Sequence, residues 1–498
     1  MARVVVIGAG VGGLATGVRL AAAGHHVTIC EQAERIGGKL GLHEADGFQF
    51  DTGPSLLTMP HVLREVFDVA GGCLEEALSL RPVEPIAHYR FADGTELDAT
   101  GDLDTFATAL DDVLTPGSGA DWRQFMARAG RIWDATHEDF LDRALDGPRT
   151  LLRQAVRIGD LRTVAPWHSL RDLGQRYLRD PRLRMFLDRY ATYTGSDPRR
   201  APGALAVVPW VEQTYGAWYV EGGLVRIGGA LGALAAERGA VVRTSADVVE
   251  VRVEGGRVSG VDLADGERLR ADVVVANADA THLYGELVRD PRTAAARRRL
   301  ARATPSLSGF VLLLGLRGRT PDLAHHTVLF PEDYDAEFDD LFGAAPRPVG
   351  DPTLYLSVPD DAAVAPAGHE AWFVLVNAPR QGQTRRDGTA VDWDAPGIAH
   401  TYAERLLDLL RQRGYDVRDR IVHRSVITPA DLGRRTRAVG GAIYGTSSNG
   451  VRAAFLRPAN RSPVPGLFLV GGSSHPGGGL PLVLMSARIV SELIGAGR

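Results

Sequence analysis

A glycine-rich loop near the amino terminus has the spacing of a nucleotide-binding motif. It lies between an apolar segment at 3–7 and a segment with helical periodicity at 14–23, and its glycines are Gly8, Gly10, Gly12 and Gly13. In a strand–turn–helix unit, Gly8 would make the tight turn, Gly10 would let the backbone approach a diphosphate, and Gly13 would let the helix pack closely on the strand. The free N–H groups at the start of the helix would bind the phosphates. The alternative is a structural turn that binds nothing.

A carboxylate follows this loop at the distance expected of a ribose ligand. Residues 26–30 form a second apolar strand, and Glu31 ends it. In dinucleotide-binding folds an acidic side chain about 20 residues beyond the turn accepts hydrogen bonds from a ribose without a 2′-phosphate. Gln32 follows directly and is included in the predicted site. The order of strand, turn, helix, strand and carboxylate favours a nucleotide site over a chance turn.

Two segments beyond this strand distinguish FAD from a nicotinamide dinucleotide. The first holds Gly37, Gly38 and Lys39. Its glycines would let the backbone run against the linking chain of FAD, and its cation would offset the charge of the diphosphate. The second segment, at 47–55, contributes Asp51, Thr52, Gly53 and Pro54. Both predict contacts with FAD, and the alternative is that they are ordinary loops.

Later segments would complete the cofactor domain. A helix and several strands expected between 217 and 278 indicate that this domain resumes after an insertion, and they add Val248 and Asn277 to the predicted site. A strand and turn at 466–472 lead toward a helix at 482–494. The turn residues predicted to bind the cofactor are Gly471, Gly472, Pro476, Gly477, Gly478 and Gly479. A turn at a helix amino end would hold the ribityl chain and pyrimidine edge of a flavin, and the alternative is a strand–turn–helix without a ligand.

These elements predict an α/β fold, namely a two-dinucleotide-binding-domain flavoprotein with a Rossmann-like FAD domain and an inserted mixed-sheet and helical substrate domain. The expected segments of the FAD-binding domain are 1–100, 216–300 and 431–498. A helical region for substrate and membrane contact is expected at 101–215, and the remaining substrate domain at 301–430. Asp102 and Pro148 are expected helix starts, and strands are expected at 308–316, 353–358 and 372–377.

Composition excludes several classes of protein. The chain has 498 residues, which is long enough for several modules. Its net charge is -5, so it lacks the basic excess of a nucleic-acid-binding protein. Its cysteines are Cys30 and Cys73, and its histidines show no metal-ligand spacing, so we expect no disulfide framework, no metal and a cytoplasmic protein. We also expect no signal peptide and no membrane span.

One part of the predicted helical region has the pattern of a membrane-surface helix. Residues 148–160 place apolar side chains on one side and arginines on the other. The alternative is an ordinary surface helix over a core. Further arginines between 162 and 189 favour peripheral contact with anionic lipid.

With these segments in place, the sequence resembles the bacterial carotenoid desaturase family, the phytoene desaturase-like flavoproteins, almost from end to end. The resemblance rests on the motifs at 6–14, 50–55, 215–219, 325–330 and 471–481. It implies an amine-oxidase-like FAD fold, a hydrophobic tunnel to the flavin, an apolar carotenoid substrate and peripheral attachment to a membrane. Members act on phytoene or on later, hydroxylated intermediates, and relatives isomerise, saturate or oxygenate. The tripeptide at 377–379 favours a 3,4-desaturase.

Desaturation would remove a hydride and a proton from the polyene, and a flavin can take the hydride. His475 is a candidate proton acceptor, because it lies in the turn expected to face the flavin and imidazole titrates near neutral pH. Its alternative role is capping or packing. Glu221 is a second candidate, and its alternative is a contact within the cofactor domain. No second glycine motif of this type follows another strand, so we expect no nicotinamide partner. The expected electron acceptor is therefore oxygen or a quinone.

Two other hypotheses about the function of this scaffold compete with a desaturase. Amine oxidases commonly place a lysine near the flavin from the substrate half of the chain, whereas Lys39 is the only lysine of this protein. A binding protein of the Rab dissociation-inhibitor type would use the same architecture without redox chemistry. The intact glycine loop, Glu31 and the carboxyl-terminal glycine turn argue against that alternative.

Overall fold

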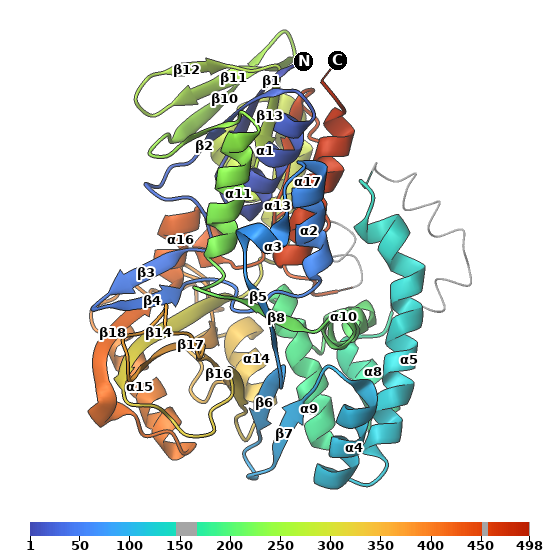
Figure 1. Ribbon diagram of the computed structural model, residues 1–498, viewed down its shortest axis with the longest axis vertical. Coiled ribbons are helices and arrows are strands. Elements are labelled where there is room, and N and C mark those ends of the chain that lie inside the picture. The colour runs from blue at the N-terminus through green and yellow to red at the C-terminus, as the bar shows by residue number, and fades with distance from the viewer. Residues whose placement is uncertain (146–166, 451–456, 498) are drawn as a thin grey trace.

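The structure is a computed structural model that describes residues 1–145, 167–450 and 457–497. The helix expected at 148–160, with its start at Pro148, lies outside these residues. Along the long axis of Figure 1, the described chain forms an upper region that holds both termini and a wider lower region.

The upper region is built on a five-stranded parallel sheet whose strands come from distant parts of the chain. β1 (Arg3–Ile7) lies between β2 (His26–Cys30) and β13 (Val273–Ala276). β9 (Val241–Arg243) and β19 (Leu467–Leu469) form the two edges. Strands of a parallel sheet are buried on both faces and are therefore continuous apolar runs, as β13 is. The strands expected at 3–7 and 26–30 are confirmed, and β9 and β13 are among the strands expected between 217 and 278.

Two layers cover this sheet. The helices on one face are α1 (Val11–Ala22), α11 (Arg226–Glu237) and α17 (Leu480–Ile494). The opposite face carries a three-stranded antiparallel sheet formed by β10 (Val248–Glu254), β11 (Arg257–Leu263) and β12 (Arg268–Arg270). Because side chains of a strand alternate, Val4 and Val6 pack against the helices while Val5 and Ile7 pack against the antiparallel sheet.

The lower region contains a seven-stranded mixed sheet in the order β18-β14-β17-β16-β15-β6-β7. Its first five strands are β18 (Ile421–Ile427), β14 (Ser308–Arg317), β17 (His369–Ala378), β16 (Leu354–Ser357) and β15 (His326–Leu329). These strands pair antiparallel, and the strands expected at 308–316, 353–358 and 372–377 are among them. The inserted mixed sheet is therefore confirmed.

The last two strands differ from the expected division of the chain. β6 (Ala87–Arg90) pairs parallel to β15, and β7 (Glu96–Ala99) pairs with β6. Residues 87–99 thus belong to the lower sheet, although the boundary expected at residue 100 assigns them to the cofactor domain. Strands this short do not reveal from sequence which sheet edge they join, because the pairing depends on packing of the whole fold.

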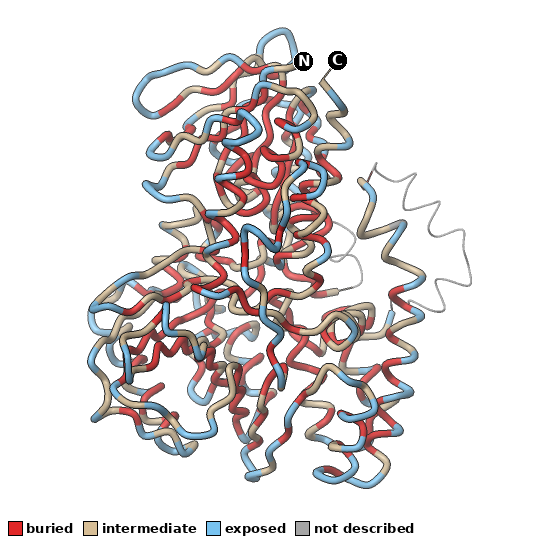
Figure 2. Tube along the Cα trace, in the orientation of Figure 1, coloured by how far each residue is buried: buried red, intermediate tan, exposed pale blue. Residues whose placement is uncertain are grey.

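Helices pack beside this sheet and share one buried core. They are α4 (Leu103–Val113), α5 (Ser118–Thr136), α8 (Leu170–Tyr177), α9 (Pro181–Arg189) and α10 (Val207–Tyr215). The Asp102 side chain accepts a hydrogen bond from the Thr105 N–H at 2.8 Å, which confirms Asp102 as the start of α4. Figure 2 shows buried residues concentrated in the upper sheet and along the inner sides of the lower elements. None of the helices within the described ranges has the length and apolar character needed to cross a bilayer.

Candidate functional site

A cavity of about 650 Å³ lies between the upper and lower regions and is lined by both. One end is lined by the glycine turns and by charged side chains of the upper region. The other end is lined mainly by apolar side chains of α10 and of the lower sheet. This volume is within the range of cofactor and small-molecule sites, so the cavity is the candidate site.

The amino-terminal glycine loop forms part of the wall. Gly8 has a φ of +90°, as the predicted tight turn requires, and Gly8, Gly10 and Gly12 line the cavity. Gly13 lies behind this surface, where a Cβ would stand 2.1 Å from the carbonyl oxygen of Gly8. The loop ends at the first residue of α1, so the unpaired N–H groups at the start of this helix lie at the cavity wall as well.

The Asn277 carboxamide sits inside a cage of glycines from both turns. Its atoms lie 2.9 Å from the place of a Cβ on Gly10, 2.8 Å from that on Gly12 and 2.5 Å from that on Gly471. These glycines therefore make room for Asn277 as well as for a ligand. The structure thus brings together two turns that are distant in sequence, and Asn277 lines the cavity between them.

Glu31 is buried and lines the cavity. Its carboxylate accepts hydrogen bonds from the N–H groups of Ala9 at 2.7 Å and Ala33 at 3.0 Å. These bonds fix the carboxylate at the end of β2, where a ribose ligand is expected. Gln32 also lines the cavity, and its side chain donates to the Arg435 carbonyl at 2.9 Å.

Four cations line the same end of the cavity: Lys39, Arg435, Arg437 and Arg457. Arg437 is paired with Asp247 at 2.6 Å, whereas no carboxylate of the described residues lies within ion-pair distance of Lys39, Arg435 or Arg457. Removal from water lowers the pKa of the Lys39 ammonium and of Arg435, and lowers the pKa of Arg457 to about 10. Buried charges without a counter-charge are costly, so this arrangement suits an anionic ligand.

The contacts of these cations support the same conclusion. Lys39 donates to the carbonyl of Ile443, and Arg435 donates to the Thr52 hydroxyl at 2.7 Å. Arg457 donates to the carbonyls of Tyr444 and Gly472, each at 2.9 Å. The buried Nε of Arg435 has no hydrogen-bond partner within the described chain. Together with the glycine turns, these donors fit the diphosphate of FAD.

The predicted segment at 51–54 divides between two roles. Thr52, Gly53 and Pro54 line the cavity. Asp51 does not, because its carboxylate accepts from the N–H groups of Leu224 at 2.7 Å and Val225 at 2.9 Å, just before α11. Burial raises the pKa of Asp51 to about 6, against the lowering effect of these two hydrogen bonds. Asp51 therefore anchors α11 behind the wall of the site.

The carboxyl-terminal turn reaches the cavity as expected. The predicted residues of this turn that line it are Gly472, Pro476, Gly477, Gly478 and Gly479. Gly478 packs against the Tyr444 ring, where a Cβ would lie 2.6 Å from Cδ1. Val248 and the two glycines Gly37 and Gly38 also line the cavity. Gly471 lies behind the wall against Asn277.

Neither candidate proton acceptor lies in the cavity wall. The His475 imidazole is fully buried, its Nε2 lies 3.0 Å from the Arg143 carbonyl, and desolvation lowers its pKa to about 4. Glu221 is exposed beside Gly222 at a separate surface pocket with Arg81 and Asp360. The position of a residue in a turn does not determine where its side chain points, so the sequence could not show this. The described residues hold no group of three or more potential metal ligands.

The apolar end of the cavity has walls from two directions. The lower sheet contributes Val311, Tyr355, Phe373 and Leu375. The helical side contributes Trp133, Leu205, Val207, Val208 and Val211. These side chains come from segments far apart in sequence, so only the folded chain shows that they share one cavity. A wall of this kind binds an apolar molecule by burial, at roughly 25 cal/mol per Å².

A buried polar cluster interrupts this apolar wall, and the sequence analysis did not identify it. Arg189 and Glu212 both line the cavity and are 7% and 4% exposed. The Tyr193 hydroxyl lies 3.0 Å from Arg189 Nη1 and 3.2 Å from Glu212 Oε2. Desolvation raises the pKa of the Glu212 carboxyl. The one sequence signal was a carboxylate in the otherwise apolar start of α10.

Comparison with known proteins identifies similar chains. The model of the family described as flavin-containing amine oxidoreductase matches residues 11–364. The chain is 36% identical to a 4,4′-diapolycopene oxygenase of Methylomonas sp, over 99% of this chain and 98% of that protein. It is 35% identical to a zeta-carotene-forming phytoene desaturase of Myxococcus xanthus, over 98% and 93% of the two chains. It is also 35% identical to a hydroxyneurosporene desaturase of Cereibacter sphaeroides, over 99% and 97%.

Solved structures show the same fold at lower sequence identity. An oxidoreductase from Methanosarcina mazei is similar with a TM-score of 0.63 and 18% identity, over 98% of this chain and 100% of that one. A redesigned putrescine oxidase is similar with a TM-score of 0.62 and 15% identity, over 99% and 98% of the two chains.

Proposed function

The chain belongs to the flavin-containing amine oxidoreductase family, and from that premise we propose that it is an FAD-dependent desaturase that removes a hydride and a proton from a long apolar polyene of the carotenoid type. The observation that carries the proposal is one cavity with two chemically different ends. A glycine- and cation-lined end suits a dinucleotide, and an apolar end suits a polyene. Relatives of similar identity bear the names of desaturases and an oxygenase, so identity alone does not select the reaction.

The cofactor end provides the contacts expected for FAD. In this proposal Glu31 binds the ribose, while Lys39, Arg435 and the amino end of α1 hold the diphosphate. The carboxyl-terminal turn binds the ribityl chain and the pyrimidine edge. The predicted division of the chain is part of the proposal, with the first cofactor segment ending before β6.

The protein's own side chains orient the polyene and exclude water. Bound FAD supplies a hydride acceptor, which the side chains of this protein cannot provide. The apolar residues of α10 and of the lower sheet bind the chain along its length and hold one bond near the cofactor end. His475 and Glu221 do not reach the cavity wall, so neither is proposed as the proton acceptor.

A product analysis tests the proposal. Purified protein loaded with FAD is mixed with phytoene or a later carotenoid in liposomes, and the products are separated and weighed by mass spectrometry. Desaturation removes two mass units for each new double bond and shifts absorption to longer wavelength. An added oxygen atom would identify an oxygenase and an unchanged mass an isomerase. A flavin-loaded protein that changes none of these polyenes would contradict the proposal and favour a non-redox binding protein.

We further propose that the reduced cofactor passes its electrons to oxygen or a quinone and that the protein attaches peripherally to a membrane. Trp167, at the edge of the described residues, is 60% exposed, and exposed tryptophan is typical of membrane interfaces. Anaerobic turnover with and without an added quinone distinguishes the acceptors. Flotation with vesicles that contain phosphatidylglycerol tests attachment, and a protein that stays at the bottom of the gradient would contradict it.

A further inference from the structure

The Arg189 guanidinium lies in the otherwise apolar wall of the cavity, where binding of a purely apolar substrate requires no charged group. It lies at the end of α9, is 7% exposed and lines the apolar end of the cavity. A guanidinium keeps its positive charge in proteins, and burying a charge costs several kcal/mol unless it is paired. The position of Arg189 therefore requires an explanation.

The partners of Arg189 use only part of its hydrogen-bonding capacity. Its Nη1 donates to the hydroxyls of Tyr89 at 3.3 Å and Tyr193 at 3.0 Å, and its guanidinium carbon lies 5.4 Å from the centre of the Tyr355 ring. No carboxylate of the described chain lies within ion-pair distance of it. The guanidinium carries five N–H donors in a planar fork, and its Nε and Nη2 donate no hydrogen bond within the described chain although the residue lines the cavity.

The nearby carboxylate is already engaged. Glu212 accepts hydrogen bonds from the hydroxyls of Tyr190 at 2.6 Å and Tyr193 at 3.2 Å. Tyr193 thus accepts from Arg189 and donates to Glu212, which orders the three groups into one chain. The remaining donors of Arg189 have no acceptor in the described chain, and an oxygen atom of a ligand in the cavity can supply one.

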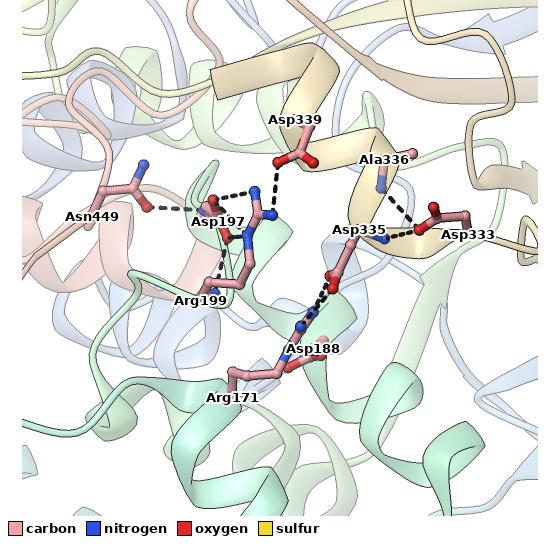
Figure 3. Close-up of polar contacts among 9 residues, drawn as sticks. All are labelled: Arg171, Asp188, Asp197, Arg199, Asp333, Asp335, Ala336, Asp339 and Asn449. Carbon is pink, nitrogen blue, oxygen red and sulfur yellow. Dashed lines mark hydrogen bonds and ion pairs between the residues drawn. The ribbon is translucent and has the colours of Figure 1, made fainter. Parts of the chain in front are cut away.

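The segment that carries Arg189 is held in place by ion pairs (Figure 3). Arg171 bridges Asp188, the neighbour of Arg189, and Asp335 of α14 (Tyr334–Phe342), each at 2.6 Å. Arg199 bridges Asp197 at 2.9 Å and Asp339 of the same helix at 2.8 Å. These bridges join the helical side of the cavity to α14, so the donors of Arg189 are positioned before a ligand binds.

We propose that Arg189, held by Tyr193 and Glu212, binds an oxygen atom on an end group of the polyene, so that the preferred substrates are oxygenated carotenoids with a hydroxyl or carbonyl group. This inference rests on the proposed function and adds the class of substrate. A site built to hydrogen-bond an oxygen rejects the analogue without it, because buried donors are then left unpaired. We expect a preference of about 10- to 100-fold in kcat/KM over the matching hydrocarbon.

The test compares one pair of carotenoids of equal chain length, with and without a terminal hydroxyl, as substrates of FAD-loaded protein in liposomes. Arg189→Met keeps the length of the side chain and removes its donors. We expect it to raise KM for the hydroxylated substrate about 10- to 100-fold, so that the preference for this substrate over the hydrocarbon is lost. Tyr193→Phe keeps the ring and should cause a smaller loss in the same direction. The control is Arg184→Met on α9, where Arg184 donates to the Leu178 carbonyl and does not line the cavity.

Three outcomes overturn the inference. Equal kcat/KM for the two substrates shows that the oxygen is not recognised. An equal loss of kcat on both substrates in Tyr193→Phe and Glu212→Gln, with an altered pH profile, assigns the cluster to the proton step instead. If the wild-type protein converts neither carotenoid, the proposed function fails and this inference fails with it. Flavin absorbance and melting temperature show whether Arg189→Met has folded. If it has not, the substrate preference of Tyr193→Phe alone tests the inference.

Discussion

The carbonyl oxygen of Gly8 occupies the place that a side chain on Gly13 would need. A Cβ on Gly13 would lie 2.1 Å from this oxygen, far inside the distance of normal contact. The atom concerned belongs to the backbone of the turn, so it cannot move away by a simple rotation. The helix α1 therefore packs on the turn only because Gly13 has no side chain.

Gly13→Ala should abolish or strongly weaken FAD binding. The added methyl group forces α1 away from the turn and displaces the N–H groups that would hold the diphosphate. Overpacking of this kind costs about 1–3 kcal/mol, so we expect FAD affinity to fall by about 5- to 150-fold, measured by fluorescence titration of the apoprotein. Gly229→Ala in α11 is the control, since a Cβ there meets nothing within 4 Å. Equal FAD affinity in both variants would contradict this role of Gly13.

Arg435→Gln should weaken the binding of FAD and leave the binding of riboflavin nearly unchanged. Riboflavin lacks the diphosphate, which is the group we assign to Arg435. Loss of charge-assisted hydrogen bonds should lower FAD affinity by about 10- to 100-fold. Arg434→Gln is a control at the neighbouring position, where the side chain is exposed and pairs with Asp394. An equal loss for FAD and riboflavin would place Arg435 away from the diphosphate.

The cofactor end of the cavity was largely predictable from sequence because its geometry is local. The spacing of Gly8, Gly10 and Gly13 is set by one turn, and β1 and β2 have the expected bounds. The polar cluster of the apolar end was not predictable. Tyr190 directly follows α9, Glu212 lies 22 residues further on in α10, and no spacing rule shows that their side chains meet. Their contact depends on how α9 and α10 pack, which the sequence pattern does not specify.

Asp51→Asn should change how stability depends on pH. Burial raises the pKa of Asp51 to about 6, above the value of about 3.9 for an unfolded chain. Between these values the folded protein binds a proton that the unfolded chain has lost, so this group makes stability fall as pH rises from about 4 to about 6. The decrease amounts to about 3 kcal/mol at pH 7.

The asparagine cannot ionise, so it should not share this decrease. We expect the melting temperature of the FAD-loaded variant, relative to wild type, to rise by several degrees between pH 4 and pH 7. Asp68→Asn at an exposed position is the control. If the difference in melting temperature between variant and wild type stays constant with pH, burial does not destabilise the ionised carboxylate of Asp51.

Glu221→Gln should leave desaturation within about 2-fold of wild type. The side chain is exposed at a separate pocket, and its conservative replacement changes nothing in the cavity wall. The measurement is kcat and kcat/KM with the same liposomal polyene over a range of pH. A loss of kcat by 100-fold or more, with one limb of the pH profile removed, would instead identify Glu221 as a proton acceptor.

Val208→Trp should block the polyene and spare the cofactor. Val208 lies on α10 in the apolar wall, and the larger ring would extend into the space proposed for the substrate. We expect kcat/KM to fall at least about 10-fold while the FAD content and flavin spectrum stay those of wild type. Val208→Leu adds one methylene at the same place and should have a much smaller effect. If Val208→Trp loses FAD as well, the two ends of the cavity are coupled through α10, and the separation of cofactor end from polyene end is wrong.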